Sequence, residues 1–325
     1  MTDVFEMPNN AESYYRKAVN LLEQRQYIEA AELMKKSFML EPNFEIFEEL
    51  IQIYLSFNKH KELHEIWQLL ELDSQDIYAD RKLNYLYGLS TPLIFDRQTA
   101  LLELYRLKEV AQANDWESKH IVYAITDLNE QTQFEKTLLK ANSEQAVEKF
   151  IAQLLEKGHG YLTKQSKTLS QMPLEASDMV IRALLLHDEV AQYLKTNLLH
   201  SLISRGARGQ YDILWFDQAR TILLEELIAY QQYPIYQQTL ATIADYCDLN
   251  NPHLYEQICQ QFDMHAMSYF PFLTDLMTDG QEWLDIFLVQ NGMEDDLEEP
   301  DLNQELLAIY VATTEEMMRL LSRND

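Results

Sequence analysis

Glycine, proline and cysteine are scarce in this chain. Of 325 residues, 7 are Gly, 8 are Pro and 2 are Cys. β-Sandwiches, barrels and glycine-looped nucleotide folds need turn residues in quantity, so this scarcity argues against them and favours helices joined by short polar turns. Two cysteines cannot build a disulfide framework, so we expect a cytoplasmic protein.

Basic residues are also scarce. The chain has 26 Lys and Arg against 53 Asp and Glu, which gives a net charge of −27. Such a chain repels phosphate backbones and anionic lipid surfaces, so we expect it to bind neither nucleic acid nor membranes. Its longest apolar runs are a few residues long, whereas a membrane span needs about 20.

The charge is unevenly distributed along the chain. No Lys or Arg occurs from 221 to 318, a span that holds 19 Asp and Glu. Apolar and aromatic packing must therefore hold this part together, because internal salt bridges are almost impossible there. We place a boundary near 205–220, and we predict an acidic helical C-terminal part over 206–325.

A repeat-like pattern lies near the N-terminus. Residues 11–44 alternate small and large apolar positions in a way that suits two closely packed helices ended by a proline. These positions are Tyr14, Ala18, Leu21, Tyr27, Ala30, Met34, Ser37, Leu40 and Pro42. Weaker copies follow at about 45–78 and 81–114, the last after a slip of two residues.

This 34-residue pattern resembles the tetratricopeptide (TPR) repeat. The resemblance implies an all-α fold in which helix pairs stack into a right-handed superhelical solenoid over about 1–140. Helical spacing of apolar residues predicts that further helical pairs continue the array over 141–205. The chain is also similar to helical TPR proteins of Gram-positive bacteria that carry a short β insertion.

Residues 211–223 interrupt the helical pattern. Two aromatic and β-branched runs flank Asp217-Gln218, and Gly206 and Gly209 precede them. This arrangement favours a β-hairpin, although Asp-Gln is a poor residue pair for the tight turn. The alternative is a helix in which Ile213 and Phe216 share one face.

The TPR resemblance implies a partner-binding groove. In that family the first helix of each repeat lines a concave surface that takes peptides or helices. The matching positions here are Glu12, Tyr15, Val19, Leu22, Ile46, Glu49, Ile53 and Ser56. A mixed apolar and acidic groove suits a basic or amphipathic peptide of a partner protein. Alternatively, the same apolar residues bury against the next helix and leave no groove.

Chemical motifs give weaker hypotheses. Cys247, His253, Cys259 and His265 are metal-ligand types spaced by six residues, which is not a familiar zinc spacing and does not keep them on one helix face. We find no phosphate loop and no nucleophile elbow, so we expect no enzymatic activity, no cofactor and no metal. An enzyme or metal protein using this set, an acidic mimic of nucleic acid, and self-association through exposed aromatics stay open as alternatives.

Overall fold

The computed structural model describes residues 10–70, 74–248, 252–293 and 302–322. The chain folds into two compact units, Met1–Thr132 and Gln133–Asp325, which we describe separately. The division falls within helix α8 (Lys119–Leu138), and both units are helical apart from one two-stranded sheet in the described residues. The expected all-α fold with a short β-hairpin is therefore confirmed. In the described residues, no helix combines the length and the apolarity that crossing a bilayer requires.

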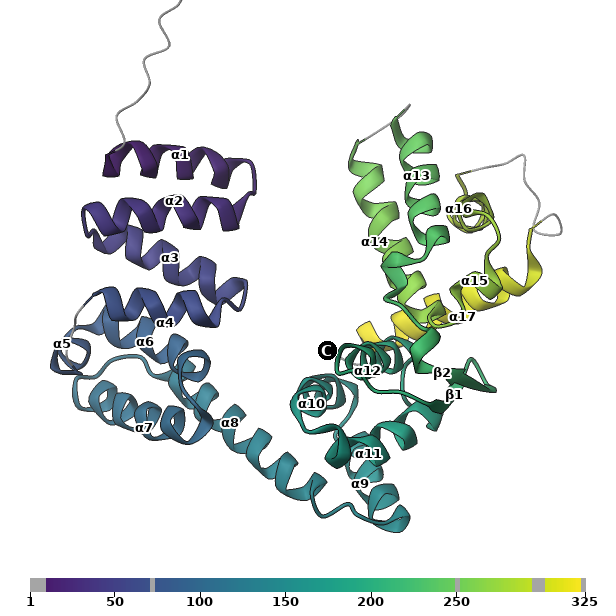
Figure 1. Ribbon diagram of the computed structural model, residues 1–325, viewed down its shortest axis with the longest axis horizontal. Helices are drawn as coiled ribbons and strands as arrows, with labels where there is room; N and C mark the ends of the chain where they lie inside the picture. Colours follow the sequence, from purple (N-terminus) through teal and green to yellow (C-terminus); the bar gives the residue numbers. More distant parts are fainter. Residues whose placement is uncertain (1–9, 71–73, 249–251, 294–301, 323–325) are drawn as a thin grey trace, which may run out of the picture. The chain divides into compact units, whose positions relative to one another are not determined.

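In the first unit, most helices pack on the next helix along the chain (Figure 1). Their bounds are α1 Ala11–Glu23, α2 Tyr27–Leu40, α3 Phe44–Ser56, α4 His60–Leu69, α5 Ser74–Ala79, α6 Arg81–Ile94 and α7 Arg97–Ala113. A helix pair occupies each of the three predicted repeat windows, and α5 is an additional short helix between the second and third pairs. Membership of the TPR family and a solenoid remain predictions.

Local sequence signals start and stop these helices. The side chains of Asn10, Asn43, Asp80 and Asp96 each accept a backbone N–H from the first turn of the helix that follows. In the first pair, Arg25 adopts a left-handed φ of 60° in the turn, at the position where TPR repeats often have glycine. Asn58 repeats this geometry in the second pair with a φ of 50°.

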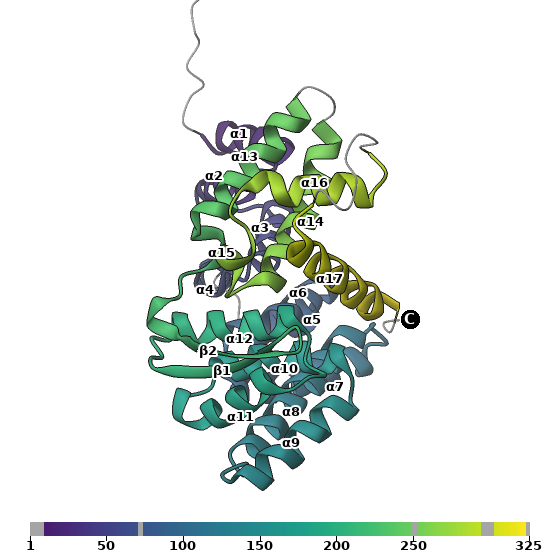
Figure 2. The same cartoon turned by 90° about the vertical axis from the view of Figure 1, so that its right-hand side faces the viewer.

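The second unit is built from the remaining elements. These are α9 Glu144–Glu156, α10 His159–Gln171, α11 Leu174–Leu186, α12 Gln192–Ser204, β1 Gln210–Trp215, β2 Gln218–Leu223, α13 Pro234–Asp248, α14 Pro252–Tyr269, α15 Leu273–Leu276, α16 Gly280–Gln290 and α17 Gln304–Ser322. Two 3₁₀ turns, Leu224–Glu226 and Tyr230–Gln232, lead from the hairpin to α13. Strand β1 packs on α11, as Figure 2 shows.

The β-hairpin prediction is confirmed, with a correction of one residue at the turn. The strands pair antiparallel with Trp215 opposite Gln218, so the turn is Phe216-Asp217 rather than Asp217-Gln218. Both turn residues have positive φ, 41° and 63°, as the turn of a tight two-residue hairpin requires. This register directs Tyr211, Ile213 and Trp215 into the core.

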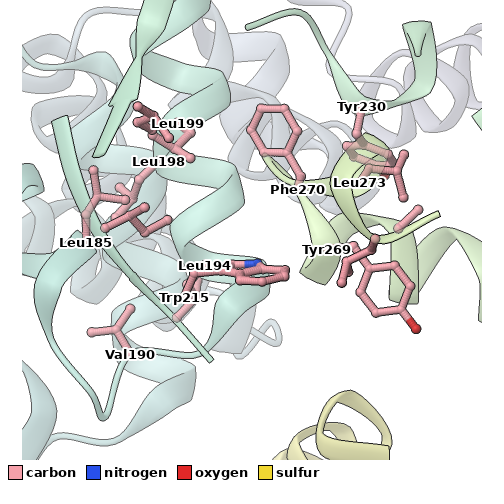
Figure 3. Packing of buried hydrophobic residues seen from close by; sticks show 14 of the residues in the cluster. Leu185, Val190, Leu194, Leu198, Leu199, Trp215, Tyr230, Tyr269, Phe270 and Leu273 are labelled. Carbon is pink, nitrogen blue, oxygen red and sulfur yellow. The ribbon is translucent and has the colours of Figure 1, made fainter. Parts of the chain in front are cut away.

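One hydrophobic core joins the whole second unit. Figure 3 shows Trp215 extending from β1 beside Leu194 toward the segment that carries Tyr269 and Phe270. The Trp215 indole N–H donates to the Ser268 carbonyl at 3.3 Å, which ties the hairpin to α14. The expected parts 141–205 and 206–325 therefore share this core, although the second part is much poorer in Lys and Arg.

Candidate peptide-binding face of the first unit

Helices α1 and α3 are connected by a partly buried hydrogen bond. The Tyr15 hydroxyl donates to Glu49 Oε1 at 3.4 Å. Burial, and then the nearby charge of Glu49, raise the pKa of the Tyr15 hydroxyl. The other oxygen of Glu49, Oε2, is buried and has no hydrogen-bond partner among the described residues. Glu49 therefore serves the contact between α1 and α3, with its second oxygen shielded from solvent.

A second contact connects α3 with α6. Lys82 Nζ lies 3.7 Å from Glu48 Oε2 and 5.5 Å from the ring centre of Phe44. Glu48 and Phe44 are one turn apart on α3, so Lys82 lies across two neighbouring side chains of that helix. Both charged side chains remain substantially exposed, so the contact marks where the two helices meet more than it stabilises them.

A third contact connects α6 with α8. The rings of Tyr85 and His120 lie with their centres 4.5 Å apart. The close approach depends on Gly88, because a Cβ there would lie 3.0 Å from His120 Nε2 and 3.1 Å from Ile121 Cγ1. Burial lowers the pKa of His120, which keeps the imidazole neutral at pH 7.

An open hollow of about 610 Å³ lies on α8 itself. Its lining is Glu117, Ser118, Lys119, Val122, Tyr123 and Thr126. Tyr123 is 70% exposed, the largest exposed fraction among the exposed large hydrophobic residues of the described chain. An apolar side chain of another molecule could bury against Val122 and Tyr123 here.

These contacts define what we call the first-helix face: Tyr15, Glu49, Lys82, Tyr85, His120 and Tyr123. It runs over α1, α3 and α6, which open the three helix pairs, and over α8. Glu12, Glu45 and Glu48 lie on the same sides of α1 and α3, beside Arg16 and Lys82. The α1 and α3 end of the face therefore carries more negative than positive charge.

The structure divides the eight predicted groove residues. Tyr15 and Glu49 are brought together, and Glu12 is exposed and accepts a hydrogen bond from Arg16 of the next turn. Ile46 and Ile53 are only 8% and 9% exposed, so they serve the core of the unit. The remaining three are Val19 and Leu22, which are half-buried, and Ser56, whose exposed hydroxyl donates to the Gln52 carbonyl of its own helix.

Sequence reasoning missed Lys82, Tyr85, His120 and Tyr123. Counted from the start of its own copy, Lys82 occupies the place of Glu12, and Tyr85 that of Tyr15, so the repeat register could have identified both. His120 and Tyr123 follow the last recognisable copy. They could be assigned only once α8 was seen to pack beside α6 through Gly88.

A polar cleft of about 980 Å³ in the second unit was also missed. It lies where the turn between α9 and α10, the loop between α11 and α12, and the last turns of α17 meet. Lys157 and Arg319 line it together with Asp188 and Glu189. Glu316 of α17 accepts the Gln192 N–H at the start of α12 at 3.1 Å, a contact between residues 124 apart that no local sequence signal announces.

The Cys and His set does not form a metal centre in the described part of the chain. No group of three or more His, Cys, Asp or Glu that could hold a metal occurs among the described residues. Cys247 is buried, Cys259 is half-buried, and neither forms a disulfide bond. The His265 ring contacts Tyr269 and Trp283 in the core, and the His253 side chain lies outside the described residues.

Comparisons with known proteins identify no relative of this chain. No family model matches the chain, and neither the curated proteins nor the solved structures contain a significant match.

Proposed function

We propose that this protein is a non-enzymatic interaction module whose first-helix face binds a segment of a partner protein. The observation that carries the proposal is the series of contacts Tyr15–Glu49, Glu48–Lys82 and Tyr85–His120. Through them the exposed sides of four helices join into one surface. Helix pairs that touch only their neighbours commonly leave such an extended binding surface uncovered.

The chemistry of this face supports a peptide as the partner. The α1 and α3 end offers carboxylates, and the α8 end offers the hollow at Val122 and Tyr123. A basic or amphipathic segment complements both. We also propose a cytoplasmic location, supported by two cysteines that form no disulfide bond, and no role in binding nucleic acid, supported by the net charge of −27.

A displayed library of random peptides, selected on the full-length chain, tests the proposal. Selected peptides should lose binding to a variant that combines E45K, E49K and Y123A. They should keep binding to a matched variant that combines E29K, E32K and Y105A, which changes exposed residues of the second helices α2 and α7. Failure to select any peptide, or equal loss in the two variants, contradicts the proposal.

A further inference from the structure

The polar cleft of the second unit is a candidate site that the proposed function does not use. Its volume is about 980 Å³, and three segments distant in sequence form its walls: the turn between α9 and α10, the loop between α11 and α12, and the last turns of α17. Sites that enclose small organic molecules commonly have volumes of about 300–1,000 Å³. The size of this cleft therefore suits such a molecule.

Two cationic side chains lie on different walls of the cleft. Lys157 follows the last residue of α9, and Arg319 lies near the end of α17. Both side chains are exposed, and in the described chain neither forms an ion pair with an acidic residue. Lys157 Nζ instead lies 4.4 Å from the ring centre of Tyr161. Both cations are therefore accessible to an anionic group of a ligand.

The backbone beside Lys157 leaves room for a ligand. Gly158 has a left-handed φ of 86°, and a Cβ built there would meet no other atom within 4 Å. A side chain at this position would project into open space and would also strain the turn. The absence of a side chain at Gly158 keeps this wall of the cleft open next to the Lys157 ammonium.

The third wall carries acidic side chains. Asp188 and Glu189 are exposed in the loop between α11 and α12. Asp188 Oδ1 lies 3.2 Å from His187 Nδ1 and accepts the Glu189 N–H at 2.9 Å. The Glu189 carboxylate has no partner among the described residues, so it is accessible to a cationic group of a ligand.

The remaining carboxylate of the cleft is already engaged. Glu316 precedes Arg319 by one turn of α17, but its two oxygens lie 3.4 and 3.1 Å from the Gln192 N–H at the start of α12. Glu316 forms no ion pair with Arg319 in the part of the chain that the structure describes. The cleft therefore holds charges of both signs on separate walls, and they do not neutralise one another through direct contacts.

From this arrangement we propose that the cleft binds a small zwitterion. Its anionic group pairs with Lys157 and Arg319, and its ammonium group pairs with Glu189. Asp188, Glu189 and Glu316 would repel a ligand that carries only negative charge, and the two cations would repel one that carries only positive charge. A molecule with a free carboxylate and a free ammonium, such as an amino acid, complements both sides.

A series of ω-amino acids tests the proposal without assuming how far apart the two charges must be. Its members differ only in the number of methylene groups, from one to seven, between the amino and carboxyl groups. Isothermal titration calorimetry with the full-length protein should show tightest binding at one chain length. The amide and the N-acetyl derivative of that compound each lose one charge and should bind about tenfold more weakly. Added salt should weaken binding of the zwitterion.

Variants of the protein assign each charge. K157Q/R319Q should remove the preference for the acid over its amide while keeping the preference for the free amine over the N-acetyl derivative. E189Q should do the reverse. The matched variants K149Q/R208Q and E148Q change exposed residues of the same unit outside the cleft, and they should leave both preferences intact.

The outcomes bear on this cleft alone. Absence of binding by every member of the series, equal affinity for the acid, the amide and the N-acetyl derivative, or preferences that survive K157Q/R319Q and E189Q would overturn the inference. Urea denaturation of each variant checks that the fold is retained. The proposed function of the first-helix face is tested separately by the peptide library, so either proposal can fail while the other stands.

Discussion

The two units of this protein bury their side chains in different ways. In the first unit, the buried apolar residues of the described chain form two separate clusters, because each helix packs mainly on its neighbours in sequence. In the second unit they form a single cluster, to which α9, the hairpin, α16 and α17 all contribute. An open series of helix pairs leaves one side of each first helix uncovered, whereas a common core covers it.

The difference determines where polar groups lie. In the first unit, Glu45, Lys82 and Tyr85 are exposed, on a surface that another molecule can reach. In the second unit, Lys195 and His265 are fully buried, and burial lowers the Lys195 pKa to about 8 and the His265 pKa to about 3. We therefore expect substitutions on the surface of the first unit to change the binding of a partner. Core substitutions and changes of pH should instead change the stability of the second unit.

The largest effect should come from the aromatic core of the second unit. Trp283 is fully buried and contacts the rings of Phe262, Phe287 and His265. Trp283→Ala should lower the free energy of unfolding of this unit by about 3–5 kcal/mol, measured by urea denaturation. Tyr123→Ala in the first unit should change stability by less than about 0.5 kcal/mol. Equal effects of the two substitutions would mean that the units do not differ in this way.

Acid should destabilise the second unit through His265. Because burial lowers its pKa from 6.5 to about 3, the unfolded chain binds a proton there between these pH values and the folded chain does not. The contribution of His265 to the free energy of unfolding is thus complete above pH 6.5 and falls as pH is lowered, by about 2 kcal/mol at pH 5. His265→Gln should flatten the stability profile between pH 7 and pH 5. An unaltered slope in His265→Gln would rule out the buried histidine as its source.

Substitution of one glycine in each unit allows the tightness of helix packing in the two units to be compared. A Cβ on Gly280 would lie 2.7 Å from the Thr239 backbone, which cannot rotate away, so Gly280→Ala should cost about 1–3 kcal/mol. A Cβ on Gly88 would meet only the His120 and Ile121 side chains, at 3.0 Å or more, so Gly88→Ala should cost less. Thermal unfolding of both variants tests this order. A larger loss of stability in Gly88→Ala than in Gly280→Ala would contradict it.

The smallest effect should come from a surface ion pair of the first unit. The Arg16 and Glu12 side chains are both largely exposed on α1. Arg16→Gln should change the free energy of unfolding by no more than about 0.5 kcal/mol at low salt. A loss above 1 kcal/mol in urea denaturation would show that this end of the first unit depends on its charges.

The sequence was most informative where a local rule decides the structure. Alternation of residues identified the hairpin, and the spacing of small and large residues in 11–44 identified the first helix pair. The turn was misplaced by one residue because Phe216 adopts a positive φ that its residue type disfavours. The buried register of Tyr211, Ile213 and Trp215 outweighs that local preference.

Contacts between distant residues could not be obtained in this way. The meeting of Tyr85 with His120 depends on how closely α6 approaches α8, and that of Glu316 with Gln192 on where α17 returns. Ile46 and Ile53 illustrate the same limit. Their repeat positions predicted a groove, but packing on neighbouring helices decides whether such a position is open or buried.

Photo-crosslinking of a selected peptide most directly tests the claim that the first-helix face binds a partner. A peptide from the random library would carry a photoreactive residue at its centre, and mass spectrometry would identify the residues of the full-length protein that it joins. The account predicts crosslinks to exposed residues of α3, α6 and α8 near Glu49, Tyr85 and Tyr123. Crosslinks confined to the second unit, such as the cleft at Lys157 and Arg319, would contradict it.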